Sequence, residues 1–128
     1  MIPKFVNIGS SSFNSNTIDY ILVRDSDTQK DKEGIDYCIS LTNKDYVHVE
    51  LSEVYPIDEM EEYLSNFDFV TVKDDYNDVY SINTKNIFYI ERCLDKFLRI
   101  HFKDSILVLL INEDKDAEDL IKVLTEWD

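Results

Sequence analysis

Apolar and polar residues alternate in two stretches of the first half of the chain. From residue 35 to 41, and again from 47 to 51, every second position is apolar. A period of two is typical of a strand with one buried face, so two strands are predicted around the turn at 42–45. Between 57 and 67 the apolar residues lie three or four positions apart, which is the spacing of one helix face.

The second half shows the same change of period. Residues 98–102 alternate, and the apolar positions from 117 to 127 have helical spacing. Between them, "SILVLLI" at 105–111 is apolar at almost every position, which predicts a strand that is buried on both faces. Two arrangements fit this strand: the centre of a joined sheet with helices on one face, or a self-complementary seam in a homodimer.

Short phrases recur in the same order in both halves. The sequence therefore predicts an internal duplication, although strand-strand-helix units can also resemble one another by chance. The predicted fold is α+β: two tandem antiparallel strand-rich units, 1–67 and 68–128, each closed by one C-terminal helix and packed as one domain over 1–128. The matched stretches are "FVNI" (5–8) with "FVTV" (69–72), "NTIDYILV" (16–23) with "TKNIFYIE" (84–91), "TNKDYVHVEL" (42–51) with "HFKDSILVLL" (101–110), and "DEMEEYLSNF" (58–67) with "EDLIKVLTEW" (118–127).

The second half also carries a family-like phrase, "FVTV…SINTKNIFYIE…FLRIHFKDSILVLLINEDKDAEDLIKVL". It resembles the small FlbD-type motility proteins, whose pattern is a strand, a phrase close to "INPxxIxxIE", a strand pair and a short terminal helix. The family usually has a glycine in its last hairpin, where this chain has Lys103 and Asp104. The resemblance implies a unit shape and no function. It rests on apolar spacing and on Ile82, Asn83, Ile87, Ile90 and Glu91.

Length and composition are those of a globular domain. A chain of 128 residues with 44% hydrophobic residues can bury a core without metal or disulfide staples. The start lacks the pattern of a signal peptide and the longest apolar run is too short to cross a bilayer, so a soluble, cytoplasmic protein is expected. Cys38 and Cys93 stand far apart without CxxC spacing, so half-buried thiols are predicted rather than a disulfide.

Charge changes this picture most. The chain has 27 acidic and 13 basic residues, a net charge of −14, and the acids are spread along its whole length. Such a field repels nucleic acids and anionic membranes, and it attracts basic protein surfaces. Direct binding to nucleic acid or membrane is therefore disfavoured.

The loop at 25–36 resembles an EF-hand calcium loop in having oxygen ligands at alternating positions. Lys30 stands where the tight-turn glycine is expected, and Asp36 replaces the bidentate glutamate. A solvated hairpin loop is therefore favoured over a calcium site. The candidate ligands are Asp25, Asp27, Gln29, Asp31 and Glu33.

Catalytic and metal-binding patterns are missing from the sequence. His48 and His101 stand alone, without an HxH, HExxH or cysteine partner, and are expected on sheet faces. The serines at 9–16 lack a GxSxG elbow, and two glycines cannot build a phosphate-binding loop. We expect no enzyme activity, no cofactor and no metal.

The remaining candidate is a partner-binding surface, with tyrosines close to acidic clusters. Carboxylates pair with arginine in bidentate fashion and phenol rings accept guanidinium stacking, so a basic, arginine-rich protein partner is predicted. A merely solubilising acidic exterior is the alternative. The candidate partner-binding residues are Asp74, Asp75, Tyr76, Asp78, Tyr80, Glu113, Asp114, Asp116, Glu118 and Asp119.

In size and charge the chain resembles the phage anti-CRISPR and anti-restriction DNA mimics, a class that no sequence motif defines. The leading hypothesis is a non-enzymatic inhibitor, encoded by a phage or another mobile element, that occupies the basic nucleic-acid groove of a bacterial defence nuclease. The alternatives are a toxin-immunity protein that plugs a cognate nuclease through a tyrosine-rich patch, a homodimeric regulatory adaptor that associates through 105–111, and a calcium-dependent module.

Overall fold

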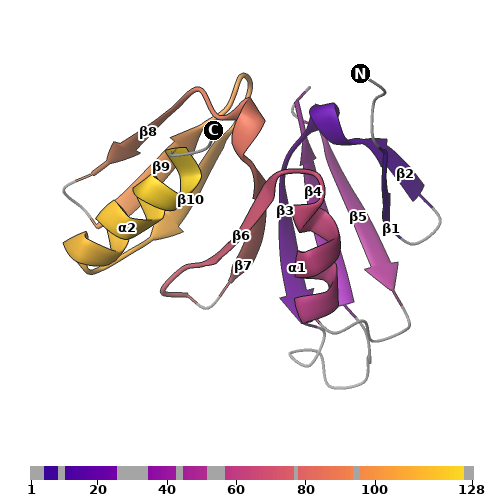
Figure 1. Ribbon diagram of the computed structural model, residues 1–128, viewed down its shortest axis with the longest axis horizontal. Helices are drawn as coiled ribbons and strands as arrows, with labels where there is room; N and C mark the ends of the chain where they lie inside the picture. The colour runs from indigo at the N-terminus through magenta and orange to yellow at the C-terminus, as the bar shows by residue number, and fades with distance from the viewer. Residues whose placement is uncertain are drawn as a thin grey trace.

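The structure is a computed structural model, and it describes most of the chain (Figure 1). The first half contains β1 (Phe5–Ile8), β2 (Ser11–Asn14), the 3-10 turn η1 (Ser15–Thr17), β3 (Ile18–Asp25), β4 (Ile35–Leu41), β5 (Tyr46–Leu51) and α1 (Ile57–Ser65). The second half contains β6 (Phe69–Lys73), β7 (Val79–Asn83), η3 (Thr84–Asn86), β8 (Tyr89–Arg92), β9 (Phe97–His101), β10 (Ile106–Leu110) and α2 (Asp114–Thr125). The described residues are 5–8, 11–25, 35–42, 45–51, 57–76, 78–93 and 96–125.

The described strands form three antiparallel sheets. β1 and β2 make a hairpin, β8, β9 and β10 make a three-stranded sheet, and the largest sheet has the order β5-β4-β3-β7-β6. A mixed α+β fold built on antiparallel strands is therefore confirmed. The halves are not separate sheets, however, because β3 pairs with β7 and places Tyr20 opposite Ile82.

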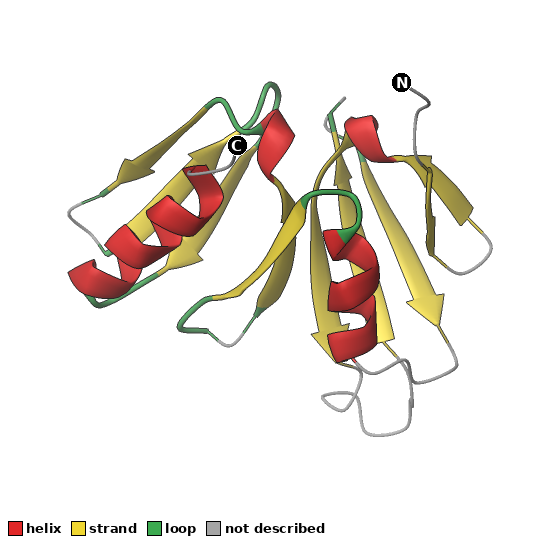
Figure 2. Ribbon diagram, in the orientation of Figure 1, coloured by secondary structure: helices red, strands yellow, loops and turns green. Residues whose placement is uncertain are grey.

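Each helix covers one part of this arrangement (Figures 1 and 2). Leu64 of α1 and the following Phe67 pack with Ile21 and Ile39 of the large sheet. On the other side of the molecule, α2 packs Ala117 and its C-terminal Leu124 into the core of the three-stranded sheet. The described residues thus form two hydrophobic cores, one under each helix.

β3 lies between the two hydrophobic cores. Its residues Ile21 and Val23 are buried in the first core, whereas Tyr20 and Leu22 face the second. Since neighbouring residues of a strand point to opposite faces, a strand with a core on each side must be apolar at consecutive positions. The run "YILV" at 20–23 meets this requirement.

The sequence assigned the two-faced strand to the wrong place. β10 lies at the edge of its sheet and pairs with β9 alone among the described strands. Leu107 and Leu109 are buried, but Ile106 and Val108 are exposed on the outer face. The prediction that 105–111 is a central strand buried on both faces is therefore wrong.

The described helices also bear on the other sequence predictions. Neither of them is long and apolar enough to cross a membrane. Cys38 and Cys93 form no disulfide, as predicted, and both are half-buried. The loop from 26 to 34, and with it most of the candidate calcium site, lies outside the described residues.

The burial pattern of β10 predicts unequal costs of truncation. Leu109→Ala should lower the free energy of unfolding by about 2–5 kcal/mol, because it leaves a cavity in the second core. Val108→Ala, on the exposed face, should change it by about 0.5 kcal/mol or less. Urea unfolding of both variants measures the difference; equal losses would show that both faces of β10 are buried.

Candidate functional site

Asp74 shapes the turn between β6 and β7. Its side chain is only 4% exposed, and its Oδ1 accepts hydrogen bonds from the backbone N–H groups of Tyr76 at 3.0 Å and Asp78 at 3.1 Å. An aspartate that binds the backbone two residues ahead is a common turn-former. Its other oxygen, Oδ2, accepts from the N–H of Leu110 at 3.5 Å. Both oxygens of the Asp74 carboxylate therefore accept hydrogen bonds that hold the fold together.

Asp75 fastens this turn to the segment that leads from β10 into α2. Its backbone N–H donates to the carbonyl of Leu110 at 2.9 Å, and its Oδ2 accepts from the N–H of Asn112 at 2.6 Å. The β6–β7 turn and the start of α2 are 36 or more residues apart in the sequence. These two bonds hold the β6–β7 turn next to the segment that leads into α2, and so bring the acidic residues of the two segments near each other.

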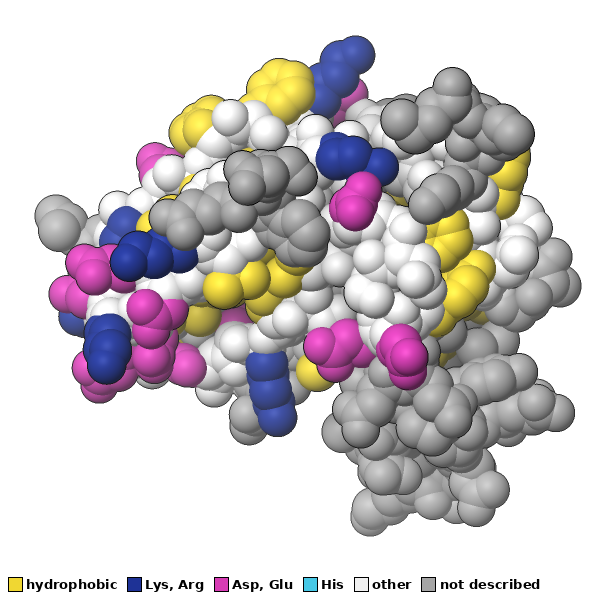
Figure 3. All heavy atoms as spheres, viewed as in Figure 1, with side chains coloured by type: hydrophobic (Ala, Val, Ile, Leu, Met, Phe, Trp, Pro, Cys, Tyr) yellow, Lys and Arg dark blue, Asp and Glu magenta, His cyan; other side chains and the backbone are white. Residues whose placement is uncertain are grey.

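The start of α2 adds most of the charge. Asp114 and Asp116 lie in its first turn, where the partial positive charge of the helix N-terminus favours carboxylates. Because Ala117 and Leu124 form the buried side of the helix, Glu118 and Asp119 are left exposed. Figure 3 shows carboxylates gathered over this part of α2, at the left of the view.

Basic residues lie beside these acids. The Nη2 atom of Arg92 is 3.1 Å from Oδ1 of Asp114, whose side chain remains well exposed. An ion pair with one solvated partner contributes little to stability, so it lowers the local negative charge without fixing the carboxylate firmly. Lys115 is the basic residue within the run of acids at 113–119.

Two of the ten predicted partner-binding residues lie away from solvent. Asp74 is bound in its turn, and Tyr80 is buried in the second core, where its ring meets Tyr20 edge-on at 6.2 Å. Neither side chain is available to a partner. The sequence placed them on a surface because acids and tyrosines alternate there, and it could not show that β7 is covered. The remaining residues form what we call the acidic surface: Asp75, Tyr76, Asp78, Glu113, Asp114, Asp116, Glu118 and Asp119.

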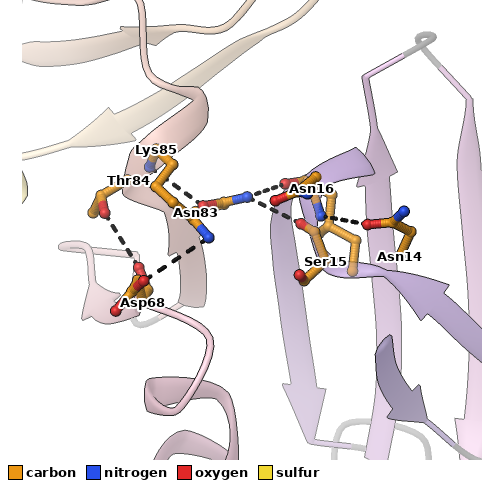
Figure 4. Close-up of polar contacts among 8 residues, drawn as sticks. Asn14, Ser15, Asn16, Asp68, Asn83, Thr84 and Lys85 are labelled. Atoms are coloured by element: carbon orange, nitrogen blue, oxygen red, sulfur yellow. Dashed lines mark hydrogen bonds and ion pairs between the residues drawn. The ribbon is translucent and has the colours of Figure 1, made fainter. Parts of the chain in front are cut away.

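A second polar cluster joins the two halves of the chain (Figure 4). The side chain of Asn83 is fully buried, and its Nδ2 donates to the carbonyls of Ser15 at 3.1 Å and Ile18 at 3.0 Å. Its Oδ1 accepts from the N–H of Lys85 at 3.3 Å, which caps η3. Asn14 caps η1 in the same manner, through the N–H of Asn16.

Asn86 and Asp19 extend this seam. Nδ2 of Asn86 donates to the carbonyls of Asn16 at 3.0 Å and Ile18 at 3.1 Å. The carboxylate of Asp19 accepts from Asn86 at 3.4 Å and from the hydroxyl of Ser105 at 3.0 Å. Burial raises the pKa of the Asp19 carboxyl, and its two hydrogen bonds oppose the rise only in part.

The sequence hypotheses did not identify this seam. Asn83 entered only through the family-like phrase, and Asp19 entered only as a member of the matched stretch 16–23, without a role of its own. The sequence does contain a signal for the two matching caps. Asn14 stands four residues before Ile18, and Asn83 stands four residues before Ile87. Only the pairing of β3 with β7 shows that one of the asparagines bridges the halves.

His101 has partners that the sequence did not indicate. Its Nε2 lies 2.7 Å from Oε1 of Glu91, and its ring stacks on Tyr89 with a centroid distance of 4.0 Å. The set spans β8 and β9 and orders their outer face. The side chain of His48, the second histidine, lies outside the described residues.

Two grooves lie beside β8. A groove of about 400 Å³ is lined by Arg92, Cys93, Lys96 and the N-terminal half of α2. Another, of about 520 Å³, runs along η3 and β8 to the C-terminal end of α2. Within the described part of the chain, no group of three or more histidine, cysteine or acidic side chains could hold a metal ion.

The seam predicts that the two capping asparagines differ in importance. Asn14→Ala should lower the free energy of unfolding by about 1 kcal/mol, the usual cost of a lost cap. Asn83→Ala should cost about 2–4 kcal/mol, because it also removes two buried hydrogen bonds to carbonyls of the other half. Equal losses in urea unfolding would mean that Asn83 acts only as a cap.

Asp19 predicts a dependence of stability on pH. Because the pKa of Asp19 is raised in the folded state, its contribution is fully present below its ordinary value of 3.8 and is lost as pH rises through the folded pKa. Asp19→Asn removes this titration. The free energy of unfolding of the variant minus that of the wild type should therefore increase from pH 3 to pH 7. Urea unfolding across this range measures it, and a pH-independent difference would contradict the raised pKa.

No protein-family model, curated protein or solved structure matches this chain. The resemblances to FlbD-type proteins and to DNA mimics therefore stay predictions, and the arguments below rest on geometry and charge.

Proposed function

We propose that the chain is a non-enzymatic binding protein whose acidic surface docks on a basic, phosphate-binding groove of a nucleic-acid-processing enzyme and so excludes DNA or RNA. The observation that carries this proposal is the double attachment of Asp75 to Leu110 and Asn112. It unites two acidic segments, distant in sequence, into a single surface. A solubilising exterior would not need that union.

The chemistry of the acidic surface suits arginine-rich partners. Exposed carboxylates can accept bidentate hydrogen bonds from guanidinium groups that normally hold phosphates. Tyr76 is 62% exposed beside Asp75 and offers a ring face for cation–π contact. A net charge of −14 adds long-range attraction to any basic surface. A defence nuclease of the kind that anti-CRISPR and anti-restriction proteins inhibit has such a groove.

We further propose that the chain arose as two copies of one unit. The described elements of each half follow one order: two strands, a 3-10 turn, three strands and a helix. The turn is capped by an asparagine in both halves, Asn14 and Asn83. Matching these caps shifts the alignment of 16–23 with 84–91 by one residue. Chance resemblance of strand-strand-helix units does not explain a shared cap.

The test compares two adjacent pairs of exposed acids. The double variant Glu118→Lys/Asp119→Lys alters the acidic surface, whereas Glu61→Lys/Glu62→Lys makes the same change of charge on α1. Each tagged protein is used to capture binding proteins from a bacterial lysate, with elution by duplex DNA or by a salt gradient. The wild type and the α1 variant should retain a nucleic-acid enzyme that DNA releases, and the α2 variant should bind it at least about tenfold more weakly.

Two outcomes would contradict the proposal. If both double variants lose the partner equally, net charge and not the acidic surface governs binding. If the wild type captures no partner that DNA displaces, the acidity serves solubility alone.

A further inference from the structure

The joint between β3 and β7 shows how one half of the chain covers the other. β7 pairs along the outer edge of β3, and the residues at this edge are buried, including Ile18, Tyr20 and Ile21. Phe69, the first residue of β6, is also buried and enters the first core beside Leu64 of α1. The first half is thus completed by the β6–β7 hairpin of the second.

The matching edge of the second half is open. Counting from the capping asparagines, Tyr89 occupies the place of Tyr20, and Ile87 and Ile90 occupy those of Ile18 and Ile21. Among the described strands, β8 pairs with β9 alone. Tyr89 is 56% exposed, whereas Tyr20 is 8% exposed. The difference marks an edge that lacks the hairpin its counterpart has.

A groove lies where that hairpin would pack. The 520 Å³ groove is lined by Ile87 and Ile90 and reaches Leu124 at the end of α2. Leu124 corresponds to Leu64, the residue of α1 beside which Phe69 is buried in the first half. In the second half nothing among the described residues fills this position, and the neighbouring Phe88 is exposed.

A hairpin that corresponds to β6–β7 lies at the other end of the same chain. β1 and β2 correspond to β6 and β7, and β2 pairs with β1 alone among the described strands. Phe5 of "FVNI" corresponds to Phe69 of "FVTV". Phe5 is 53% exposed, whereas Phe69 is 2% exposed. The hairpin therefore carries an aromatic side chain that lacks the pocket its counterpart occupies.

We propose that the β1–β2 hairpin of a second copy of this chain adds to the open edge of β8. The strands pair antiparallel with Phe13 of the second copy opposite Tyr89, as Ile82 lies opposite Tyr20 within the chain. Phe5 of the second copy enters the groove beside Leu124. Asn14 of the second copy takes the part of Asn83 and donates to carbonyls of η3 and the residue after it.

Chemistry favours this occupant over an unrelated strand. The described residues of β2 are Ser11, Ser12, Phe13 and Asn14, which carry no charge, so the edge has none of the charged side chains that guard exposed edges. The two edges lie toward opposite ends of the long axis in Figure 1. The contact is therefore head-to-tail, and it closes a ring or extends a chain of copies according to the rotation at each joint.

The inference rests on the correspondence between the halves and not on the proposed partner. The two proposals predict opposite effects of salt concentration. Self-association brings like-charged copies together and should strengthen as salt screens their repulsion, whereas binding of a basic partner through the acidic surface should weaken.

The experiment is sedimentation velocity of the full chain over a range of concentrations in 0.5 M NaCl. The wild type should exceed its monomer mass of 15.1 kDa as concentration rises. Phe5→Glu should raise the dissociation constant at least about tenfold, because it replaces the aromatic ring that packs beside Leu124 with a charged side chain. Ile106→Glu is the control, since this exposed residue lies on β10 and should leave association unchanged.

A cross-link tests the register independently. In the double variant Phe13→Cys/Tyr89→Cys, directly opposed residues of neighbouring copies lie within disulfide range. Oxidation should give covalent multimers on a denaturing gel, and neither single variant should give them. Any one of three results would overturn the proposal. The wild type stays monomeric, the double variant gives no multimer, or Ile106→Glu abolishes association while Phe5→Glu leaves it unchanged.

Discussion

The pairing of β3 with β7 is the constraint on which the rest of the structure depends. It puts strands of both halves into one sheet and gives β3 a core on each face. Hydrogen bonds of a strand edge carry little specificity by themselves, because any extended segment can pair there. The buried amide of Asn83 supplies it, since its Nδ2 fits only where the carbonyls of Ser15 and Ile18 lie within reach. Packing and polar satisfaction thus select the same register.

Most of the charged side chains lie outside the contact between β3 and β7. The polar groups of the seam are mostly amides and carbonyls, and the buried carboxylate of Asp19 accepts from donors of the second half. Burial nevertheless disfavours its ionised form. The exposed acids gather instead where the β6–β7 turn meets the start of α2, whereas the groove proposed for a neighbouring copy reaches the other end of this helix, at Leu124. A basic partner and a neighbouring copy could therefore use separate surfaces.

The sequence predicted what local periodicity controls. Alternation located the strands from 35 to 51, and helical spacing located both helices to within a few residues. It failed where burial depends on distant segments. β10 and β3 both read as apolar runs, yet only β3 has cores on both faces. Asp74 and Asp75 are adjacent and chemically identical, yet in the folded chain Asp74 is buried and bound within its own turn, whereas Asp75 is exposed.

The same acidity that would attract a basic partner also limits pairing between copies. The uncharged strand β2 and the unpaired edge of β8 favour aggregation at high protein concentration, because exposed strand edges pair with little discrimination. Copies that each carry a charge of −14 repel one another once their surfaces approach to within about the Debye length, about 8 Å at physiological ionic strength. Only a contact that buries Phe5 and satisfies the amide of Asn14 would offset that repulsion. Under the two proposals, charge would serve specificity twice, by attracting basic surfaces and by opposing self-contacts other than the one between β2 and β8.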